Sequence, residues 1–361
     1  MDSSIYTKLA TVLTTHDIDE LGLLHIVPPV DELPETSAEY YPLVVVDTKL
    51  GIPIFSVPAI LAEAQKCFVK LRIADAIHSA QWKELDIVTR VMTVVKPDNY
   101  TAMNTRKQLI VSKLVAVKDE LVFLNLVFTI PKHSKSSVAW HHRQWLYTVR
   151  ATETASDSYM DADEVGKELG LCTRAATLYP RNYYAWTFRH WLLDTTIIHH
   201  RHLLETEFSQ ARRWVELNVS DHSGVQHLER VLQALSPLPF DFQDHIVWLN
   251  DLIKRFPGHE ALWCHRRFCV HFAETLSLNL AQYYKEQHQF VEDRIGAADD
   301  ATLEKAAMNT DTELALRFGL WISMLEKKHD LVNHQKRAMY LAKLQSTATI
   351  PIVYHQLEYS K

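Results

Sequence analysis

The stretch that decides the fold is "PRNYYAWTFRHWLL", residues 180–193. Asparagine at 182 is a strong helix N-cap residue, and the proline two residues earlier ends whatever precedes it. Trp186 then falls one turn into the expected helix, and Arg189 shares its face three residues later. This order predicts a helix that starts at Asn182 and buries Trp186 and Trp191 against its neighbours.

The same order of residues recurs along the chain. "SKSSVAWHHRQWLY" comes before this stretch and "PGHEALWCHRRFCV" after it, and two weaker copies are "PDNYTAMNTRKQLI" and "VSDHSGVQHLERVL". The anchor positions of the five units, in chain order, are Met103, Trp140, Trp186, Val225 and Trp263. This regular recurrence suits one pair of helices per unit, with the units stacked as an α-solenoid whose period is roughly 40 residues.

Each unit repeats two polar positions around its anchor. Four residues before the anchor stand the helix-cap positions Asn99, Ser136, Asn182, Asp221 and His259, of which the first four are strong caps. Three residues after it stand Arg106, Arg143, Arg189 and Arg266, with Leu228 in the fourth unit. We expect each arginine to lay its stem on the anchor ring and to bond carbonyls or carboxylates of the adjoining layer. The residues interpreted as structural are therefore Trp140, Arg143, Trp186, Arg189, Trp263 and Arg266.

The composition narrows the class of protein. The 361 residues are 47% hydrophobic and 23% charged, and only eight are glycine, which favours an all-α fold over turn-rich β or α/β folds. A net charge of −6 argues against a nucleic-acid binder. No apolar run approaches the roughly 20 residues of a transmembrane helix, and the N-terminal residues lack a secretory signal pattern. Four scattered cysteines fit neither a disulfide framework nor a four-thiolate zinc site, and they favour a cytoplasmic location.

We predict an all-α protein whose helical hairpins stack as a right-handed, crescent-shaped α-solenoid of tetratricopeptide-like character. Residues 1–90 form a non-repeat N-terminal arm with helices, residues 91–272 hold the five units, and residues 273–361 form C-terminal helices with a degenerate last repeat.

Three further segments lie outside the repeat pattern. The β-branched run at residues 42–55 predicts a short strand or an extended arm. The acidic residues 151–164 predict a long solvated loop, and residues 294–312 a mobile insertion.

The five units resemble the protein prenyltransferase α-subunit repeat, whose core is Pro-x-Asn-Tyr-x-x-Trp-x-x-Arg. "PRNYYAWTFRHWLL" and "SSVAWHHRQWLY" match it closely. "DIDELGLL", "DTKLG", "VSDHSG" and "PGHEALWCHRR" narrow the resemblance to the branch whose members act in type III geranylgeranyltransferase. The resemblance covers roughly residues 17–272.

That resemblance implies a heterodimer. The other chain would be the β subunit of Rab geranylgeranyltransferase, an α–α barrel that holds zinc and geranylgeranyl diphosphate. The reaction would move a geranylgeranyl group onto a cysteine near the C-terminus of an acceptor protein, such as a farnesylated SNARE. The resemblance thus implies no cofactor in this chain and no activity without the β subunit.

One catalytic residue follows from the family pattern. Farnesyltransferase α subunits contribute a lysine to the diphosphate five residues before the second-repeat tryptophan, and Lys135 stands at that position here. The family's tyrosine two residues further on is replaced by Ser137. The resemblance also implies that the third unit contributes residues to the subunit interface, with the diphosphate side as an alternative place for them, namely Arg181, Asn182, Tyr183 and Tyr184.

Other interpretations stay open at this point. Without the family pattern, Lys135 is interpreted as a solvated surface lysine. The chain also fits a non-catalytic helical scaffold that binds proteins, although its period is longer than that of tetratricopeptide repeats. A third alternative is the α subunit of another protein prenyltransferase. His141 and His142 point to different helix faces and predict no shared metal.

Overall fold

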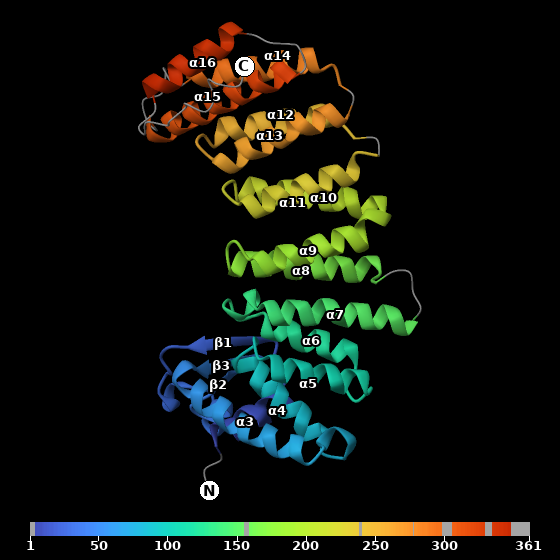
Figure 1. Ribbon diagram of the computed structural model, residues 1–361. Helices are drawn as coiled ribbons and strands as arrows, with labels where there is room; N and C mark the ends of the chain where they lie inside the picture. The colour runs from blue at the N-terminus through green and yellow to red at the C-terminus, as the bar shows by residue number, and fades with distance from the viewer. Residues whose placement is uncertain are drawn as a thin grey trace. The chain divides into compact units, whose positions relative to one another are not determined.

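The computed structural model describes residues 4–154, 159–237, 240–276, 278–297, 305–328 and 334–347. The chain divides into two compact units, Met1–His199 and His200–Lys361 (Figure 1). The described parts are mainly α-helical, which confirms the all-α class. Consecutive helices pack as pairs, which confirms the helical-hairpin repeat.

The N-terminal arm combines short helices with a three-stranded sheet. Its helical elements are α1 (Ile5–Thr15), η1 (Val30–Glu32), α2 (Glu35–Tyr40), η2 (Ile54–Ser56), α3 (Val57–Ile73) and η3 (Ala76–His78). The strands are β1 (Glu20–Leu24), β2 (Val44–Val46) and β3 (Lys49–Pro53), in the order β1-β3-β2. Strand β3 is parallel to β1 and antiparallel to β2. The strand prediction for residues 42–55 is confirmed, whereas β1 was not predicted.

The arm is anchored on the repeats by β1. The Leu21 amide donates a hydrogen bond of 2.8 Å to the Thr129 hydroxyl, just after the first helix of the second repeat. Leu21 on β1 and its partner Leu50 on β3 are both buried. The hydrogen bond to Thr129 ties the sheet to the second repeat, and the leucine pair packs inside the sheet.

The repeat units are pairs of helices as predicted. Within Met1–His199 they are α4 (Trp82–Val95) with α5 (Tyr100–Val111), α6 (Val117–Val127) with α7 (Ser137–Thr154), and α8 (Ala162–Leu178) with α9 (Tyr183–Thr195). Within His200–Lys361 they are α10 (Arg201–Leu217) with α11 (His222–Leu235), and α12 (Phe242–Arg255) with α13 (Glu260–Thr275). Two short 3₁₀ helices, η4 (His133–Lys135) and η5 (Ile197–His199), lie in the first of these compact units.

The second helix of each pair starts at its predicted cap. Asn99, Ser136 and Asn182 each accept a hydrogen bond from the backbone amide three residues on, at 3.1, 3.1 and 3.3 Å. Asp221 accepts one from the Ser223 amide, whereas His259 makes no side-chain cap bond.

The anchors of all five units are buried, and the three tryptophans among them, Trp140, Trp186 and Trp263, are at most 4% exposed. Trp191, which was also predicted to be buried, is only partly so. The anchor position therefore carries the core of each unit.

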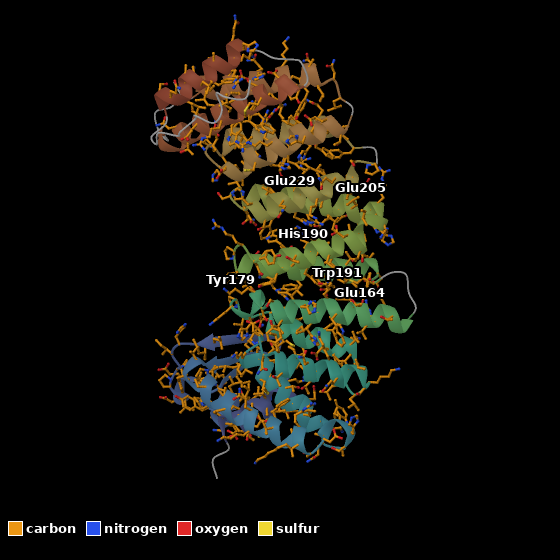
Figure 2. The ribbon with its side chains drawn as sticks, in the orientation of Figure 1. Glu164, Tyr179, His190, Trp191, Glu205 and Glu229 are labelled. Atoms are coloured by element: carbon orange, nitrogen blue, oxygen red, sulfur yellow. The ribbon has the colours of Figure 1, made fainter. Side chains whose placement is uncertain are left out.

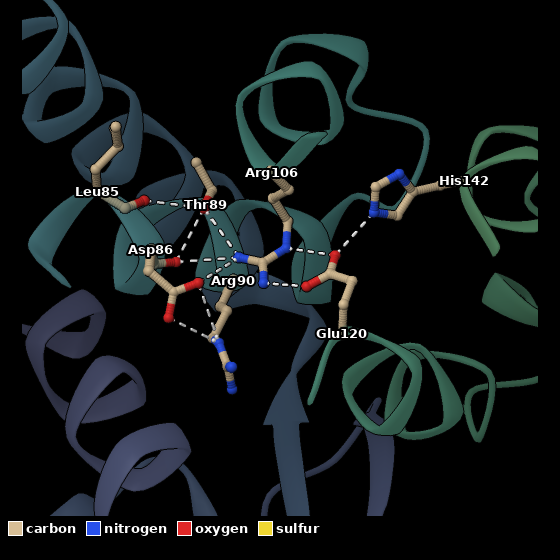
Figure 3. Close-up of polar contacts among 7 residues, drawn as sticks. All are labelled: Leu85, Asp86, Thr89, Arg90, Arg106, Glu120 and His142. Atoms are coloured by element: carbon tan, nitrogen blue, oxygen red, sulfur yellow. Dashed lines mark hydrogen bonds and ion pairs between the residues drawn. The ribbon is translucent and has the colours of Figure 1, made fainter. Parts of the chain in front are cut away.

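The repeat arginines tie successive layers together. Arg106 on α5 donates to Glu120 on α6, to Asp86 on α4 at 2.9 Å and to the Thr89 hydroxyl at 3.0 Å (Figure 3). His142 on α7 reaches the same Glu120 carboxylate at 2.9 Å. Arg106 thus bonds a carboxylate of the adjoining layer as predicted, whereas Arg266 on α13 donates to the Asn250 side-chain oxygen on α12.

The predicted stacking of arginine on the anchor ring is found in one described unit. Arg189 lies over the Trp186 ring, 5.5 Å from its centre. Arg106 lies instead over Phe123 at 4.7 Å, and Arg266 over Phe290 at 3.7 Å. These phenylalanines come from the next helices of the stack, so Arg106 and Arg266 extend toward the adjoining layer rather than folding back on their own helix.

The predicted loop at residues 151–164 is shorter than expected. Helix α7 continues to Thr154, and Asp161 starts α8 with a capping box that it forms with Glu164. The Arg150 guanidinium pairs with Glu164 at 2.5 Å, so this acidic cluster is a helix start and not a solvated loop. Residues 155–158 of the prediction lie outside the described residues.

The C-terminal helices are α14 (Leu280–Ala297), α15 (Lys305–Lys328) and α16 (His334–Thr347). The prediction of a mobile insertion at residues 294–312 is wrong at both of its ends, and residues 298–304 lie outside the described residues. Arg294 pairs with Asp311 at 2.8 Å, and Asp311 also accepts from the Trp263 indole at 2.9 Å. Asp311 is 1% exposed, so these ends are part of the core beside the fifth unit.

Candidate functional site

The predicted site residues lie where the second helices of the first three units begin. We call this region the cap edge and define it as residues 96–100, 132–137 and 179–184. The Ser136 hydroxyl donates to the Asp98 carboxylate at 2.6 Å, and the Asn182 amide donates to the Ser134 carbonyl at 2.7 Å. These two bonds join the three segments, so the cap edge has a defined arrangement within one compact unit.

Lys135 is exposed on the cap edge and has one partner close by. Its ammonium donates to the Tyr179 hydroxyl at 2.8 Å and lies 4.5 Å from the centre of the same ring. Tyr179 follows the last residue of α8, whereas Glu164 is near the start of that helix, at the opposite end of the pair (Figure 2). The structure thus places a solvent-facing cation and a phenol hydroxyl side by side.

The backbone explains how these side chains are presented. His133, Ser134 and Lys135 form the short helix η4, in which His133 and Ser134 are buried. The Ser134 carbonyl accepts from the Trp140 indole at 2.7 Å as well as from Asn182. A fixed turn with two buried residues therefore leaves the third, Lys135, facing solvent.

His133 is the titratable group buried beneath this turn. Burial lowers its pKa to about 4, with the nearby charge of Lys132 adding to the decrease and Asp98 opposing it. The imidazole is 4% exposed and its Nδ1 atom has no hydrogen-bond partner among the described residues. The turn that carries Lys135 consequently packs best with a neutral His133.

Arg181 occupies the position in the third unit that Lys135 occupies in the second. Its backbone is left-handed, with φ 59°, a conformation that glycine adopts without strain. The fifth unit has Gly258 at the same position, with φ 81°. Arg181 is exposed, so the chain keeps a solvent-facing guanidinium at a strained position.

Exposed tyrosines flank these cations. Tyr100 and Tyr183 are the first residues of α5 and α9, and each is 68% exposed. Tyr184 is 37% exposed and its ring meets that of Tyr183 edge to face, with centres 5.3 Å apart. Exposed aromatic rings beside arginine are typical of protein interfaces.

The predicted site residues all lie on the cap edge, but Asn182 is buried and has a structural role. Lys135, Arg181, Tyr183 and Tyr184 are exposed on the cap edge, whereas Asn182 is 1% exposed. The Asn182 side chain caps α9 and bonds the Ser134 carbonyl of the previous unit. Its role in an interface would therefore be to position the exposed residues beside it. Tyr179 was missed, because its contact with Lys135 is made between layers and is not part of the repeat pattern.

A second group of polar residues was also missed. His245, His265 and Cys269 are buried, and their ligand atoms all lie within 4.8 Å of one another. Their sequence separations gave no signal of a metal site, because the first histidine comes from the neighbouring helix α12. His265 and Cys269 share one face of α13, four residues apart.

Comparison with known proteins supports the repeat assignment. The family model described as protein prenyltransferase alpha subunit repeat matches residues 165–196 and 242–273, which cover α8–α9 and α12–α13. The chain therefore carries helical repeats of the prenyltransferase alpha subunit type. Among the described residues, no helix is both long and apolar enough to cross a bilayer.

The chain is similar to particular proteins that carry these repeats. It is 29% identical over 301 residues to protein prenyltransferase alpha subunit repeat-containing protein 1 of Danio rerio, covering 70% of this chain and 67% of the relative. The Homo sapiens protein of the same name is 28% identical over 313 residues, covering 72% and 74%.

The fold is also found among solved structures. The structure described as Candida albicans protein geranylgeranyltransferase-I complexed with GGPP aligns with a TM-score of 0.57 and 17% identity. The alignment covers 80% of this chain and 90% of that one.

Proposed function

We propose that this chain is the α subunit of a heterodimeric protein geranylgeranyltransferase. The cap edge would meet the β subunit of Rab geranylgeranyltransferase, and that subunit would hold the zinc and the geranylgeranyl diphosphate. The reaction would transfer the lipid to a cysteine near the C-terminus of a cytoplasmic acceptor such as a farnesylated SNARE. The observation that carries this proposal is the Lys135–Tyr179 pair on an exposed edge of prenyltransferase-type repeats.

The chemistry gives each partner a separate task. The acceptor thiolate attacks C1 of the lipid, the C1–oxygen bond breaks, and diphosphate leaves with that electron pair. A fixed cation near the leaving oxygens stabilises the transition state, because negative charge grows there as the bond breaks. Lys135 would supply that cation from this chain, and the Tyr179 hydroxyl would orient it through their 2.8 Å bond.

The Tyr179 hydroxyl also offers an explanation of Ser137. The family's tyrosine at that position would donate a hydrogen bond of long reach, and serine is too short to replace it. Tyr179 places a phenol hydroxyl beside Lys135 from the adjoining layer instead. We infer that Tyr179 takes over the role of the family's tyrosine, whose position is occupied by Ser137 in this chain.

The first experiment is co-expression of the full chain with the Rab geranylgeranyltransferase β subunit, followed by size-exclusion chromatography and a geranylgeranyl-transfer assay on a farnesylated SNARE. A one-to-one complex with transfer supports the proposal. Separate peaks without transfer overturn this pairing and favour the non-catalytic scaffold.

The catalytic role of Lys135 needs a matched control. Lys132 is also exposed, lies three residues earlier and carries the same charge. We expect Lys135→Ala to lower kcat by about 100-fold, the usual loss on removing one transition-state donor, with complex formation unchanged. Lys132→Ala should leave kcat within a few-fold. Equal effects of both variants would assign Lys135 to general surface charge.

A further inference from the structure

Arg106 and Arg143 are each joined to a buried glutamate on the first helix of the next unit. Arg143 on α7 donates to both oxygens of Glu168 on α8, at 2.6 and 2.5 Å, and both side chains are buried. Removing either member of such a buried pair leaves the other charge uncompensated, so the two residues depend on each other.

This pairing is missing between the fourth and fifth units. Leu228 replaces the arginine of the fourth unit. His245 in the fifth unit corresponds to Glu168 in the third unit. Each is the fourth residue of its family match, which is 165–196 for Glu168 and 242–273 for His245. Both members of the ion pair are therefore exchanged together. Leu228 and His245 are each 0% exposed, so the position remains part of the core.

The vacated polar position is filled by two imidazoles and a thiol. His245 on α12 and His265 on α13 bring their Nε2 atoms within 2.9 Å of each other, and the Cys269 sulfur lies 3.9 Å from His265 Nε2. All three side chains are fully buried. The aromatic rings of Trp248 and Phe268 lie against the histidines, with centres 5.0 Å from His245 and 5.8 Å from His265.

The histidines at the place of His265 in two other units have a different partner. His142 pairs with Glu120 at 2.9 Å, and His227 pairs with Glu207 at 2.5 Å, so each imidazole faces a carboxylate. The Nε2 atom of His265 instead faces another imidazole, while its Nδ1 atom faces the Glu229 carboxylate.

The residue one turn further along α13 is exchanged as well. The second and fourth units have Leu146 and Val231 at that place, whereas the fifth unit has Cys269. Compared with those units, the fifth unit has an imidazole in place of an acid and a thiol in place of an aliphatic side chain. Both exchanges bring in atoms that bind transition metals.

The outer nitrogen of His265 is also fixed. Its Nδ1 atom lies 3.2 Å from a carboxylate oxygen of Glu229 on α11, which leaves Nε2 directed at His245 and Cys269. A histidine that ligates a metal usually donates its other nitrogen to a carboxylate, which sets the tautomer and the ring orientation. The His245 Nδ1 atom is buried and has no partner among the described residues, so hydrogen bonding alone does not account for the cluster.

We propose that His245, His265 and Cys269 bind a Zn²⁺ ion between α12 and α13. Two imidazoles and a thiolate suit Zn²⁺ better than the oxygen-preferring Mg²⁺ or Ca²⁺. A water molecule would complete the fourth position. This proposal departs from the sequence-based expectation that the chain holds no metal.

The geometry is close to what zinc requires. Tetrahedral zinc with bonds of about 2.0 Å to nitrogen and about 2.3 Å to sulfur separates two nitrogens by about 3.3 Å and nitrogen from sulfur by about 3.5 Å. The separations of 2.9 Å between His245 and His265, and of 3.9 Å between His265 and Cys269, need to change by only a few tenths of an ångström. The separation of His245 from Cys269 is at most 4.8 Å, so zinc binding would require these two atoms to approach each other by up to about 1.3 Å.

The ion would be structural. It would bind α12 to α13, and Glu229 would extend the connection to α11, across the interface where the arginine–glutamate bond is missing. It would be distinct from the zinc proposed for the β subunit, because all three ligands belong to this chain.

Cobalt substitution tests the site on the full chain alone, without the β subunit. The chain is treated with chelator, loaded with one equivalent of Co²⁺, and examined for the thiolate-to-cobalt charge-transfer band in the near ultraviolet and for tetrahedral d–d bands. Displacement by Zn²⁺ should remove these bands, and one zinc per chain should remain after gel filtration. The exposed His199, His200 and His202 would bind cobalt without producing a sulfur band.

Neighbouring cysteines give a matched pair of variants. Cys269→Ser should abolish the charge-transfer band, whereas Cys264→Ser, five residues earlier on the same helix, should keep it. Glu229→Gln should weaken zinc binding by about 10-fold. Thermal unfolding with chelator checks that the variants fold, and Zn²⁺ should raise the Tm of the wild type and of Cys264→Ser but not of Cys269→Ser. A folded wild type with no sulfur band and no Zn²⁺-dependent Tm shift would overturn the proposal and leave a polar packing cluster.

Discussion

The Arg106 guanidinium and the Glu120 carboxylate form an ion pair in which neither side chain is exposed to solvent. Arg106 belongs to the second helix of one repeat and Glu120 to the first helix of the next (Figure 3). Arg143 and Glu168 repeat this relationship one layer further along. The repeats are therefore joined by buried charge pairs as well as by apolar packing.

Glu120→Gln is expected to lower the free energy of unfolding by about 3 kcal/mol, because breaking a buried pair leaves the Arg106 charge without its main counterion. Arg106 and His142 hold the pKa of Glu120 far below its usual range despite burial, in keeping with an ionised carboxylate. Urea unfolding followed by circular dichroism measures the loss. Glu205→Gln, in an exposed pair with Arg201, serves as the control and should leave the midpoint unchanged. Equal midpoints for both variants would contradict the prediction.

Stability should decrease as the pH falls from about 6.5 to about 4, because His133 has a folded pKa of about 4 and an ordinary unfolded one. Between these values the unfolded chain binds a proton that the folded chain does not, so the His133 contribution is complete above pH 6.5 and is lost toward pH 4. The free energy of unfolding should therefore fall by at most about 3 kcal/mol between pH 6.5 and pH 4.

Thermal or urea unfolding between pH 4 and pH 7 measures this slope. His133→Gln keeps a polar side chain that does not titrate. Its free energy of unfolding should therefore change less with pH than that of the wild type, by the His133 contribution. His200→Gln, at an exposed position, should retain the wild-type slope. A slope that persists in His133→Gln would assign the pH dependence to other groups.

Arg181→Gly should leave the chain as stable as the wild type or more stable by up to about 1 kcal/mol, because it relieves a left-handed backbone conformation that glycine adopts freely. The same change removes a solvent-facing cation from the cap edge. We expect weaker binding of the proposed β subunit, measured by titration, despite the unchanged stability. Arg174→Ala, an exposed arginine on α8, is the control, and equal affinities for both variants would exclude Arg181 from the interface.

The sequence predicts the repeats well because each unit carries its own local signals. Asn99, Ser136 and Asn182 are caps that act over three residues, and a buried anchor followed by an arginine marks the helix face in every unit except the fourth. The strand β1 was missed because its hydrogen bonds are made with β3, where Leu21 pairs with Leu50, and "ELGLL" alone has no strong strand preference.

The sequence also predicts part of the candidate site, because some of its residues hold fixed positions within a repeat unit. Lys135 and Arg181 hold fixed positions relative to a tryptophan, so the repeat pattern finds them. Tyr179 reaches Lys135 from the adjoining layer, and no local signal marks that contact. Likewise, the bond of the Asn182 amide to Ser134 in the previous unit is a contact that the repeat pattern does not contain.

Tyr179→Phe tests whether the Lys135 ammonium is oriented by its neighbour. The variant keeps the ring 4.5 Å from the ammonium but removes the hydroxyl that accepts its hydrogen bond. We expect complex formation and the Tm to be unchanged, since the ring still packs and the lost bond is exposed. If Lys135 acts on the leaving diphosphate, kcat should fall by about 10-fold, less than in Lys135→Ala, because the cation remains but is less well directed.

The double variant with both Lys135→Ala and Tyr179→Phe decides between two explanations of the lower kcat. When the hydroxyl acts only through Lys135, Tyr179→Phe should have no further effect in the Lys135→Ala background. Independent, multiplicative losses would show that Tyr179 contributes to transfer by itself, as a direct hydrogen-bond donor to the diphosphate. Tyr100→Phe, an exposed tyrosine of the same edge, should leave kcat within a few-fold and controls for general loss of phenol groups.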